Sequence, residues 1–436
     1  MRCWVRLPPR LLTDRRPLPL PALKLLHLGN HYPPYAIGQS ERQCRLVVNE
    51  LTARGHFNRI LTSNYTIPDV PDRERLVTRR LRLNTSNVPG PYSPLVWTER
   101  VNRRALLDEI EEVPPDVVLI WSMSGLSNSL IWELHARRIP MVFAVLDHWP
   151  RQRLREDPWM RWWSAALPFP QRAIRRLLRM TFVAQWLHRR YPIDPILQLP
   201  MRHAFFASRA LRESIRVAGL PVADAPVIPY CIGRDEIPGQ PQRRDEPRRL
   251  LWIGKLDTDR DPMTAVQAIQ ELRHHGQHQF TLDMFGRGEP VFESRIHDYV
   301  REAQLGGAVT LRHASVEEMV SLFPTYDLFL YTARYPEPFP IVVLRAMAAR
   351  LPVVSTLEGA CGEILRNGEN CQAFRTGDHI GCATAVRSLA ADRELVDRIT
   401  DSAYRQLLDE HSAVVVAGRI ERILQQTLRD QESSGR

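Results

Sequence analysis

The sequence predicts an α/β protein with two doubly wound domains, each built on a parallel sheet with helices on both faces. With 436 residues, the chain is too long for one ordinary hydrophobic core. Short apolar runs alternate with longer amphipathic segments in both halves, and a polar segment rich in Pro and Arg separates the two series. We therefore expect two Rossmann-like domains facing a central cleft.

Five short apolar runs predict the strands of the first domain. They are residues 23–30, 58–63, 116–123, 139–147 and 203–208. Residues 43–53 carry apolar side chains at helical spacing, and the following Arg54-Gly55 is typical of a helix end. Each helix then returns the chain to the next parallel strand.

A second series of strands begins after the polar segment. The predicted strands are residues 249–255, 280–286, 308–313, 327–332 and 351–356, with helices over 262–275 and 316–323. The expected organisation is an arm (1–22), a first domain on the acceptor side (23–235), a linker (236–248), a second domain on the donor side (249–408) and a C-terminal helix and tail (409–436) that packs back on the first domain. Ligands bind at the carboxyl ends of strands in such sheets.

The net charge of +10 and the pI of 9.6 suggest an anionic partner, but the composition favours a solvated basic surface. All but two of the 59 basic residues are arginines, and they are spread along the chain. We expect no nucleic-acid partner. The six cysteines show no metal-ligand spacing, so no metal site is expected. Pro and Arg interrupt the N-terminal apolar runs, and no run approaches about 18 residues, so we predict a cytoplasmic protein.

Three loops could carry chemistry. The first, residues 31–41, places Gly38 before a helix, where backbone amides can approach an anion, although an ordinary turn explains the spacing equally well. The second, residues 254–260, holds Lys255 and Arg260 after a strand, and two cations there can neutralise a diphosphate. The third places Glu337 before a helix, where its carboxylate can bind sugar hydroxyls or merely cap the helix.

From about Leu23 to Gln425 the sequence resembles the retaining family 4 glycosyltransferases of the GT-B fold, the glycosyl transferases group 1. The order and spacing of the matching segments carry the resemblance. The segments are YPPYAIGQSE with ELTARGH, FAVLDHW, FASRALRESIRVAGLP with VIPY, GKLDTDR, FGRGEP, YDLFLYTARYPEPFPIVVLRAMAARLPVVST and GACGEILRNGEN.

The resemblance implies transfer of a hexose from a nucleotide diphosphate sugar to a glycan, glycolipid or small-molecule acceptor, with no cofactor and no metal. It assigns catalytic roles to Glu337, Lys255 and Arg260. The implied donor-binding residues are Gly38, Gly254, Lys255, Arg260, Gly286, Glu337, Phe339, Pro340, Ile341 and Arg345, and Asp147 and His148 lie on the acceptor side.

Three positions depart from the family pattern. Arg345 stands where the family usually has a second glutamate bonded to the ribose, and a guanidinium can only donate hydrogen bonds. Gln39 replaces a glycine, and Leu146 replaces a histidine. His148 is a poor substitute if the strand continues, because neighbouring strand residues face opposite sides. The alternative function is a catalytically impaired nucleotide-binding or regulatory protein. A sugar-nucleotide epimerase would need paired acid and base groups, and the sequence identifies none.

Residues 159–191 combine tryptophans with a basic amphipathic pattern. One interpretation is contact with an anionic membrane surface, with the enzyme peripheral on the inner face. The other is an ordinary helix of the first domain whose apolar stripe packs on the sheet.

Overall fold

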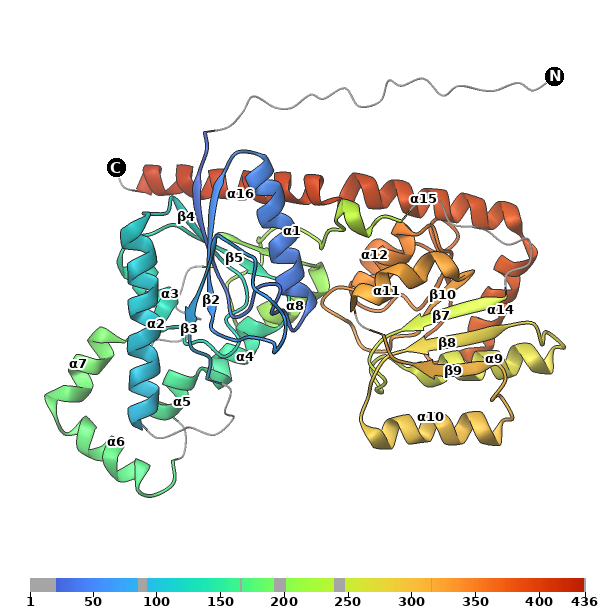
Figure 1. The fold of residues 1–436 in the computed structure, drawn as a ribbon, viewed down its shortest axis with the longest axis horizontal. Coiled ribbons are helices and arrows are strands. Elements are labelled where there is room, and N and C mark those ends of the chain that lie inside the picture. Colours follow the sequence, from blue (N-terminus) through green and yellow to red (C-terminus); the bar gives the residue numbers. More distant parts are fainter. Residues whose placement is uncertain are drawn as a thin grey trace.

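The computed structural model describes residues 21–84, 92–164, 167–191, 201–238, 248–314 and 316–434. They form two domains, each with a six-stranded parallel sheet and helices on both faces (Figure 1). The predicted fold class is confirmed. Nearly all of the predicted arm and most of the predicted linker lie outside the described residues.

The first sheet has the order β3-β2-β1-β4-β5-β6, in which the direction of winding reverses between β1 and β4. Its strands are β1 (Lys24–Leu28), β2 (Phe57–Ser63), β3 (Val77–Leu81), β4 (Val117–Ile120), β5 (Met141–Val145) and β6 (Ala204–Phe206). Its helices are α1 (Gln39–Ala53), α2 (Tyr92–Glu112), α3 (Ser129–Ala136), α4 (Trp149–Glu156), α5 (Pro158–Ser164), α6 (Gln171–Arg179), α7 (Phe182–Arg190) and α8 (Arg209–Val217). Strand β3 was not predicted from the sequence, because it is an edge strand with mostly half-buried and polar residues.

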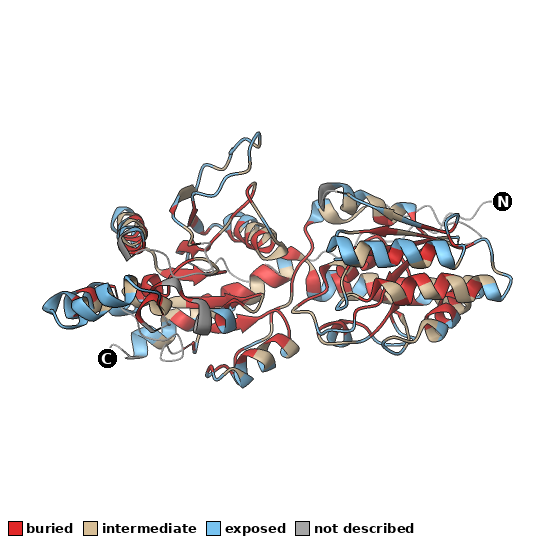
Figure 2. Ribbon diagram, turned by 90° about the horizontal axis from the view of Figure 1, so that it is seen from below, coloured by how far each residue is buried: buried red, intermediate tan, exposed pale blue. Residues whose placement is uncertain are grey.

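The second sheet has the order β12-β11-β10-β7-β8-β9, and its winding reverses between β7 and β10. Its strands are β7 (Arg249–Ile253), β8 (Thr281–Phe285), β9 (Val309–Arg312), β10 (Leu328–Tyr331), β11 (Val353–Ser355) and β12 (Gln372–Ala373). Its helices are α9 (Pro262–His274), α10 (Pro290–Glu302), α11 (Val316–Leu322), η3 (Phe323–Thr325), α12 (Ile341–Ala348), α13 (Cys361–Ile364) and α14 (His379–Ala391). Central strands β7 and β10 are almost wholly buried, as a sheet covered on both faces requires (Figure 2).

The chain crosses between the domains twice, and the two crossings are hydrogen-bonded to each other. The first runs through Ile232 and the short helix η2 (Arg234–Glu236), and the second joins α15 (Arg393–His411) to α16 (Ala413–Ser434). The Ile232 N–H donates to the His411 carbonyl at 2.8 Å, and the Ala413 N–H donates to the Ile232 carbonyl at 3.2 Å. Helix α15 packs on α12 of the second domain, whereas α16 packs on α1 and β5 of the first (Figure 1).

A polar contact fixes α16 to the first domain. The buried Glu421 carboxylate lies 3.1 Å from Arg54 Nη1 and 3.0 Å from His56 Nε2. Arg54 Nη2 also donates to the Val414 carbonyl at 2.7 Å. One carboxylate therefore satisfies two donors at an interface between segments far apart in the sequence.

The alternative that residues 159–191 form a helix packed on the sheet is wrong. Trp159, Trp162 and Trp163 are buried in a separate small core with α2 and α7, and α6 has no buried residue. The segment is split into three short helices. No helix of the described chain is long and apolar enough to cross a bilayer.

We expect Glu421→Ala to lower the free energy of unfolding by about 2 kcal/mol, because it leaves two donors at the α16 interface without their acceptor. Urea unfolding measures the change. Glu432→Ala, on an exposed position of the same helix, is the matched control and should change stability by less than about 0.5 kcal/mol. Equal effects of the two substitutions would show that the contact does not stabilise the interface.

Candidate active site

The candidate site lies where the winding of the second sheet reverses. The loop after β7 begins with Gly254 and Lys255, and the loop after the neighbouring strand β10 leads to Glu337. Parallel strands place both loops at the same edge of the sheet. This edge, at the point of reversal, is the usual ligand-binding position in doubly wound sheets.

Two glycines allow the loops after β7 and β8 to touch. A Cβ at Gly286 would lie 1.9 Å from the Gly254 carbonyl oxygen, and one at Gly288 would lie 2.1 Å from the Leu256 carbonyl oxygen. The Leu256 N–H donates to the Arg287 carbonyl at 2.9 Å. Gly286, a predicted donor-binding residue, therefore has a packing role in the structure, and its contact with a donor stays a prediction.

The loop from β7 to α9 is held in shape by buried hydrogen bonds. Asp261 adopts a left-handed conformation with φ of 46°, and its carboxylate accepts the Thr264 N–H at the start of α9. Thr332 Oγ1 lies 2.9 Å from the Arg260 carbonyl oxygen and accepts a hydrogen bond from Trp252 Nε1 at 2.9 Å. These contacts fix the backbone that carries Arg260.

The structure brings together two of the three residues with predicted catalytic roles. The Arg260 guanidinium forms an ion pair with the Glu337 carboxylate, across the two loops. Lys255 lies on the same loop as Arg260, with its side chain 67% exposed and its Nζ 3.4 Å from Asp257 Oδ2. The ammonium group is thus exposed to solvent, where an anionic ligand can reach it.

Arg345 has protein partners that the sequence analysis did not predict. Its buried guanidinium donates to Glu236 Oε2 at 3.0 Å and lies 3.4 Å from Gln39 Oε1. Glu236 belongs to η2 in the first crossing, and Gln39 begins α1 of the first domain. The residue that departs from the family pattern therefore joins the second domain to the first.

The loop before α12 also contacts the first domain. The Phe339 ring stacks on Tyr230 with centroids 5.0 Å apart, and Ser208 Oγ donates to the Pro338 carbonyl at 2.7 Å. Pro340 precedes the first residue of α12, Ile341, which is buried. Because Ser208 follows β6 and Pro338 follows β10, the carboxyl edges of the two sheets meet here.

A carboxylate of the second domain caps a helix of the first. Glu363 in α13 accepts the N–H groups of Arg209 and Ala210, at 2.9 and 2.8 Å. These two amides open α8, where the helix dipole favours negative charge. The sequence pattern alone shows no signal for this contact, because its partners are separated by about 150 positions in the chain.

On the first-domain side, Gly38 precedes α1 and donates its N–H to Glu41 Oε2 at 2.9 Å. This contact occupies one of the backbone amides at the helix start that were expected to approach an anion. A glutamate three residues after a helix start is a capping signal that could have revealed it. Burial raises the pKa of Glu41.

Asp147 and His148 follow β5 without continuing it, because the strand ends at Val145. The condition under which His148 would be a poor substitute, a strand that continues through it, is therefore not met. Burial raises the pKa of Asp147 to about 6, partly offset by the Trp149 N–H and reinforced by the Glu41 carboxylate. Both ring nitrogens of His148 are buried without a hydrogen-bond partner, and burial, with Arg151, lowers the pKa of the ring.

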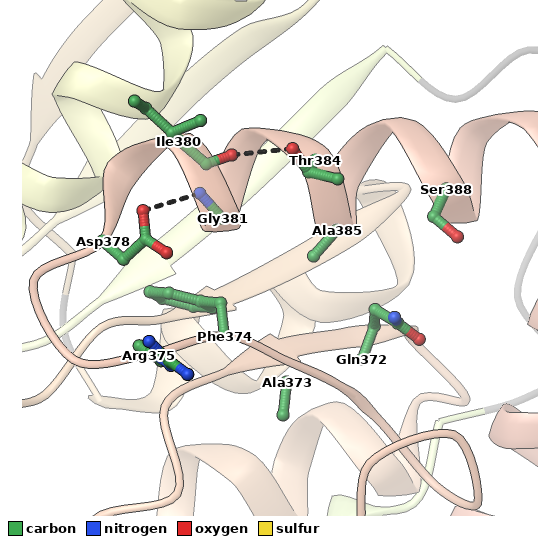
Figure 3. A pocket seen from close by; sticks show the side chains of 10 residues that line it. All are labelled: Gln372, Ala373, Phe374, Arg375, Asp378, Ile380, Gly381, Thr384, Ala385 and Ser388. Atoms are coloured by element: carbon green, nitrogen blue, oxygen red, sulfur yellow. Dashed lines mark hydrogen bonds between the residues drawn. The ribbon is translucent and has the colours of Figure 1, made fainter.

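A pocket of about 530 Å³ lies between the edge strand β12 and α14 (Figure 3). Phe374, Arg375 and Asp378 line it, and Asp378 caps α14 by accepting the Gly381 N–H at 2.8 Å. None of the residues predicted for the site borders this pocket in the described structure. The described residues also contain no group of three or more His, Cys, Asp or Glu side chains that could hold a metal ion.

Comparison with known proteins finds a family match for the second half of the chain. Residues 233–406, which carry Lys255, Arg260, Glu337 and Arg345, match the family described as glycosyl transferases group 1. The second domain belongs to this family.

Curated relatives and solved structures agree with this assignment. The chain is 29% identical to a glycogen synthase of Mycobacterium tuberculosis over 180 residues, which span 40% of this chain and 41% of that protein. It is 24% identical to the alpha-D-kanosaminyltransferase of Streptomyces kanamyceticus over 82% of this chain and 92% of that protein. The structure of Anabaena HepE in complex with UDP and glucose superposes with a TM-score of 0.64 at 16% identity, covering 92% of this chain and 99% of that one. The shared GT-B fold thus extends to both domains.

The Arg345–Glu236 pair can be tested by charge reversal. We expect Arg345→Glu to lower the free energy of unfolding by about 2 kcal/mol, because it places two carboxylates together at a buried position. The double variant Arg345→Glu/Glu236→Arg should recover about half of this loss or more, as measured by urea unfolding. Additive effects of the two substitutions would contradict a direct interaction.

The raised pKa of Asp147 predicts a pH-dependent stability. In the unfolded chain its pKa is near 3.9, so between about pH 4 and pH 6 the folded protein binds more protons and loses stability as the pH rises. Asp147→Asn removes this loss. The free energy of unfolding of the variant, relative to that of the wild type, should therefore be higher at pH 7.5 than at pH 4. The expected difference is on the order of 2 kcal/mol. A difference that does not change with pH would mean that the carboxyl group titrates normally.

Proposed function

We propose that this protein is a retaining glycosyltransferase that moves a hexose from a nucleotide diphosphate sugar to a glycan, glycolipid or small-molecule acceptor. The observation that carries the proposal is the grouping of Lys255, Arg260 and Glu337 at the point of reversal of the second sheet, in a domain of the glycosyl transferases group 1. The complex of HepE with UDP and glucose supports a nucleotide-sugar donor.

In the proposed reaction the diphosphate leaves with additional negative charge. The Lys255 ammonium group and the Arg260 guanidinium stabilise this charge, and the amides that begin α12 add a partial positive charge. Arg260 is fixed by buried backbone contacts, so little reorganisation accompanies the reaction. Glu337, paired with Arg260, accepts hydrogen bonds from hydroxyl groups of the donor sugar.

The acceptor enters from the first domain in this proposal. Asp147 lies on that side, and a carboxyl group with a pKa of about 6 can take a proton from an acceptor hydroxyl near neutral pH. The neutral imidazole of His148, without a partner for either nitrogen, can bind a further acceptor hydroxyl. Both residues are positioned by the turn that connects β5 to α4.

One observation favours the second candidate, an impaired transferase that binds a nucleotide and regulates a partner. Arg345 cannot accept hydrogen bonds from ribose hydroxyls, and its Nε and Nη2 groups already donate to Glu236 and Gln39. The paired Arg260 and Glu337 favour the active enzyme, because they retain both charges that the resemblance assigns to the reaction.

A screen of donor hydrolysis over UDP, GDP and ADP sugars, followed by mass spectrometry, tests the proposal. We expect the wild type to hydrolyse at least one donor, and Lys255→Ala to lower kcat about 100-fold or more. The chain contains a single other lysine, Lys24, which is the exposed first residue of β1. Lys24→Ala is therefore the matched control and should keep full turnover.

Near wild-type turnover of Lys255→Ala would remove this residue from the mechanism. Complete absence of hydrolysis, together with measurable binding of a nucleotide by calorimetry, would favour the impaired protein. Melting temperatures of the variants separate these outcomes from misfolding.

A further inference from the structure

Residues 167–191, which we call the arginine hairpin, expose an unusual amount of apolar surface. The hairpin contains α6 and α7 and lies at the end of the first domain remote from the second (Figure 1). Its exposed apolar side chains are Phe169, Ile174, Leu177, Met180, Phe182, Val183 and Trp186. Their exposed fractions range from 42% for Ile174 to 86% for Phe182. Figure 2 shows this part of the chain as largely exposed.

Helix α6 turns two of its arginines toward the protein and two apolar side chains, Ile174 and Leu177, toward solvent, while Leu178 packs partly on the small core. Arg175 Nη1 donates to the Trp162 carbonyl at 3.0 Å, and Arg179 Nη2 donates to the Trp163 carbonyl at 2.7 Å. Leu177, on the other side of the helix, is 64% exposed. An amphipathic helix that stabilises a core has the opposite orientation.

The hairpin is nevertheless anchored firmly. Trp159 and Trp163 are buried against Tyr191 and Leu187, and Trp159 Nε1 donates to the Tyr191 carbonyl at 2.7 Å. The two tryptophan rings pack edge to face with centroids 5.7 Å apart. The exposed side chains therefore belong to helices that are held by a small hydrophobic core, and not to a frayed end of the chain.

Charge identifies the partner of this surface. Between Leu167 and Tyr191 the chain has six arginines and no acidic residue. Four of these arginines are exposed on the hairpin and are free of the contacts that tie Arg175 and Arg179 to α5: Arg172, Arg176, Arg189 and Arg190. A second copy of the chain would bring like charges together, which disfavours self-association.

We propose that the arginine hairpin docks the protein on an anionic lipid membrane. Phe182 and Trp186 enter the interface at the level of the headgroups, and the exposed arginines bind lipid phosphates. The hairpin follows β5, α4 and α5 in the chain, so the docked membrane lies beside the domain that carries Asp147 and His148. This inference does not depend on the proposed transfer reaction.

Co-sedimentation of the full chain with vesicles tests the proposal. We expect binding to vesicles of equal parts phosphatidylcholine and phosphatidylglycerol, little binding to phosphatidylcholine alone, and loss of binding at high salt. Arg172→Ala/Arg176→Ala should lower the partition coefficient onto anionic vesicles roughly thirtyfold. In this conversion, a tenfold change corresponds to about 1.4 kcal/mol of binding free energy. Phe182→Ser/Trp186→Ser should weaken it by about tenfold or more.

The matched control is Val291→Ser/Arg295→Ala on α10 of the second domain, where Val291 is 73% exposed. This variant should bind vesicles within about twofold of the wild type. Failure of the folded wild type to bind either vesicle, equal binding to both, or an equal loss in the control would overturn the proposal. A dimer of the wild type in the absence of lipid, dissociated by Phe182→Ser/Trp186→Ser, would also overturn the proposal. The surface would then be a contact between two copies of the chain.

Discussion

The hydrogen-bonded pair of crossings between the domains is the constraint on which the rest of the structure depends. A single linker would leave two doubly wound domains free to move, as interfaces within one chain commonly allow. Here the strand-like contact of Ile232 with His411 and Ala413 joins the outgoing and returning segments. The His411 ring also lies near Tyr230 and Phe339, so the same point connects to the stacked rings between the domains. The two carboxyl edges are therefore held together.

Three ion pairs hold the cations of the candidate site. Lys255 lies beside Asp257, Arg260 pairs with Glu337, and the Arg345 guanidinium pairs with Glu236. The first two pairs are within the second domain, whereas the third exists only because the first crossing passes α12. In the proposed function a diphosphate adds acceptors to the first two pairs. In the third pair a buried Arg345 meets a half-buried Glu236, so this cation contributes to the position of the two domains.

Much of the fold was predictable because the central strands are buried on both faces. Continuous apolar runs mark β1, β4, β5, β7 and β10 in the sequence, and each lies at the expected place. The loop positions of Lys255, Arg260 and Glu337 followed from those strands. Strand β3 was not predicted because an edge strand with mostly polar, half-buried residues lacks such an apolar run.

The contacts that could not be predicted are those between segments far apart in the sequence. Glu236 meets Arg345 across 109 positions, and its own surroundings in the sequence contain no hint of this partner. Whether β5 continues through His148 stayed open at the level of the sequence, because strand ends are poorly marked by apolar patterns. For residues 159–191 the amphipathic pattern was correct, but the pattern alone does not say which side of a helix faces the protein.

A crystal structure of the protein with a bound nucleoside diphosphate tests the central claim most directly, that the point of reversal in the second sheet holds the donor. The account predicts phosphate oxygens within hydrogen-bonding distance of Lys255 Nζ and the Arg260 guanidinium, between the ends of β7 and β10. A diphosphate bound instead in the pocket between β12 and α14, or against the first domain without contact to either cation, would contradict it.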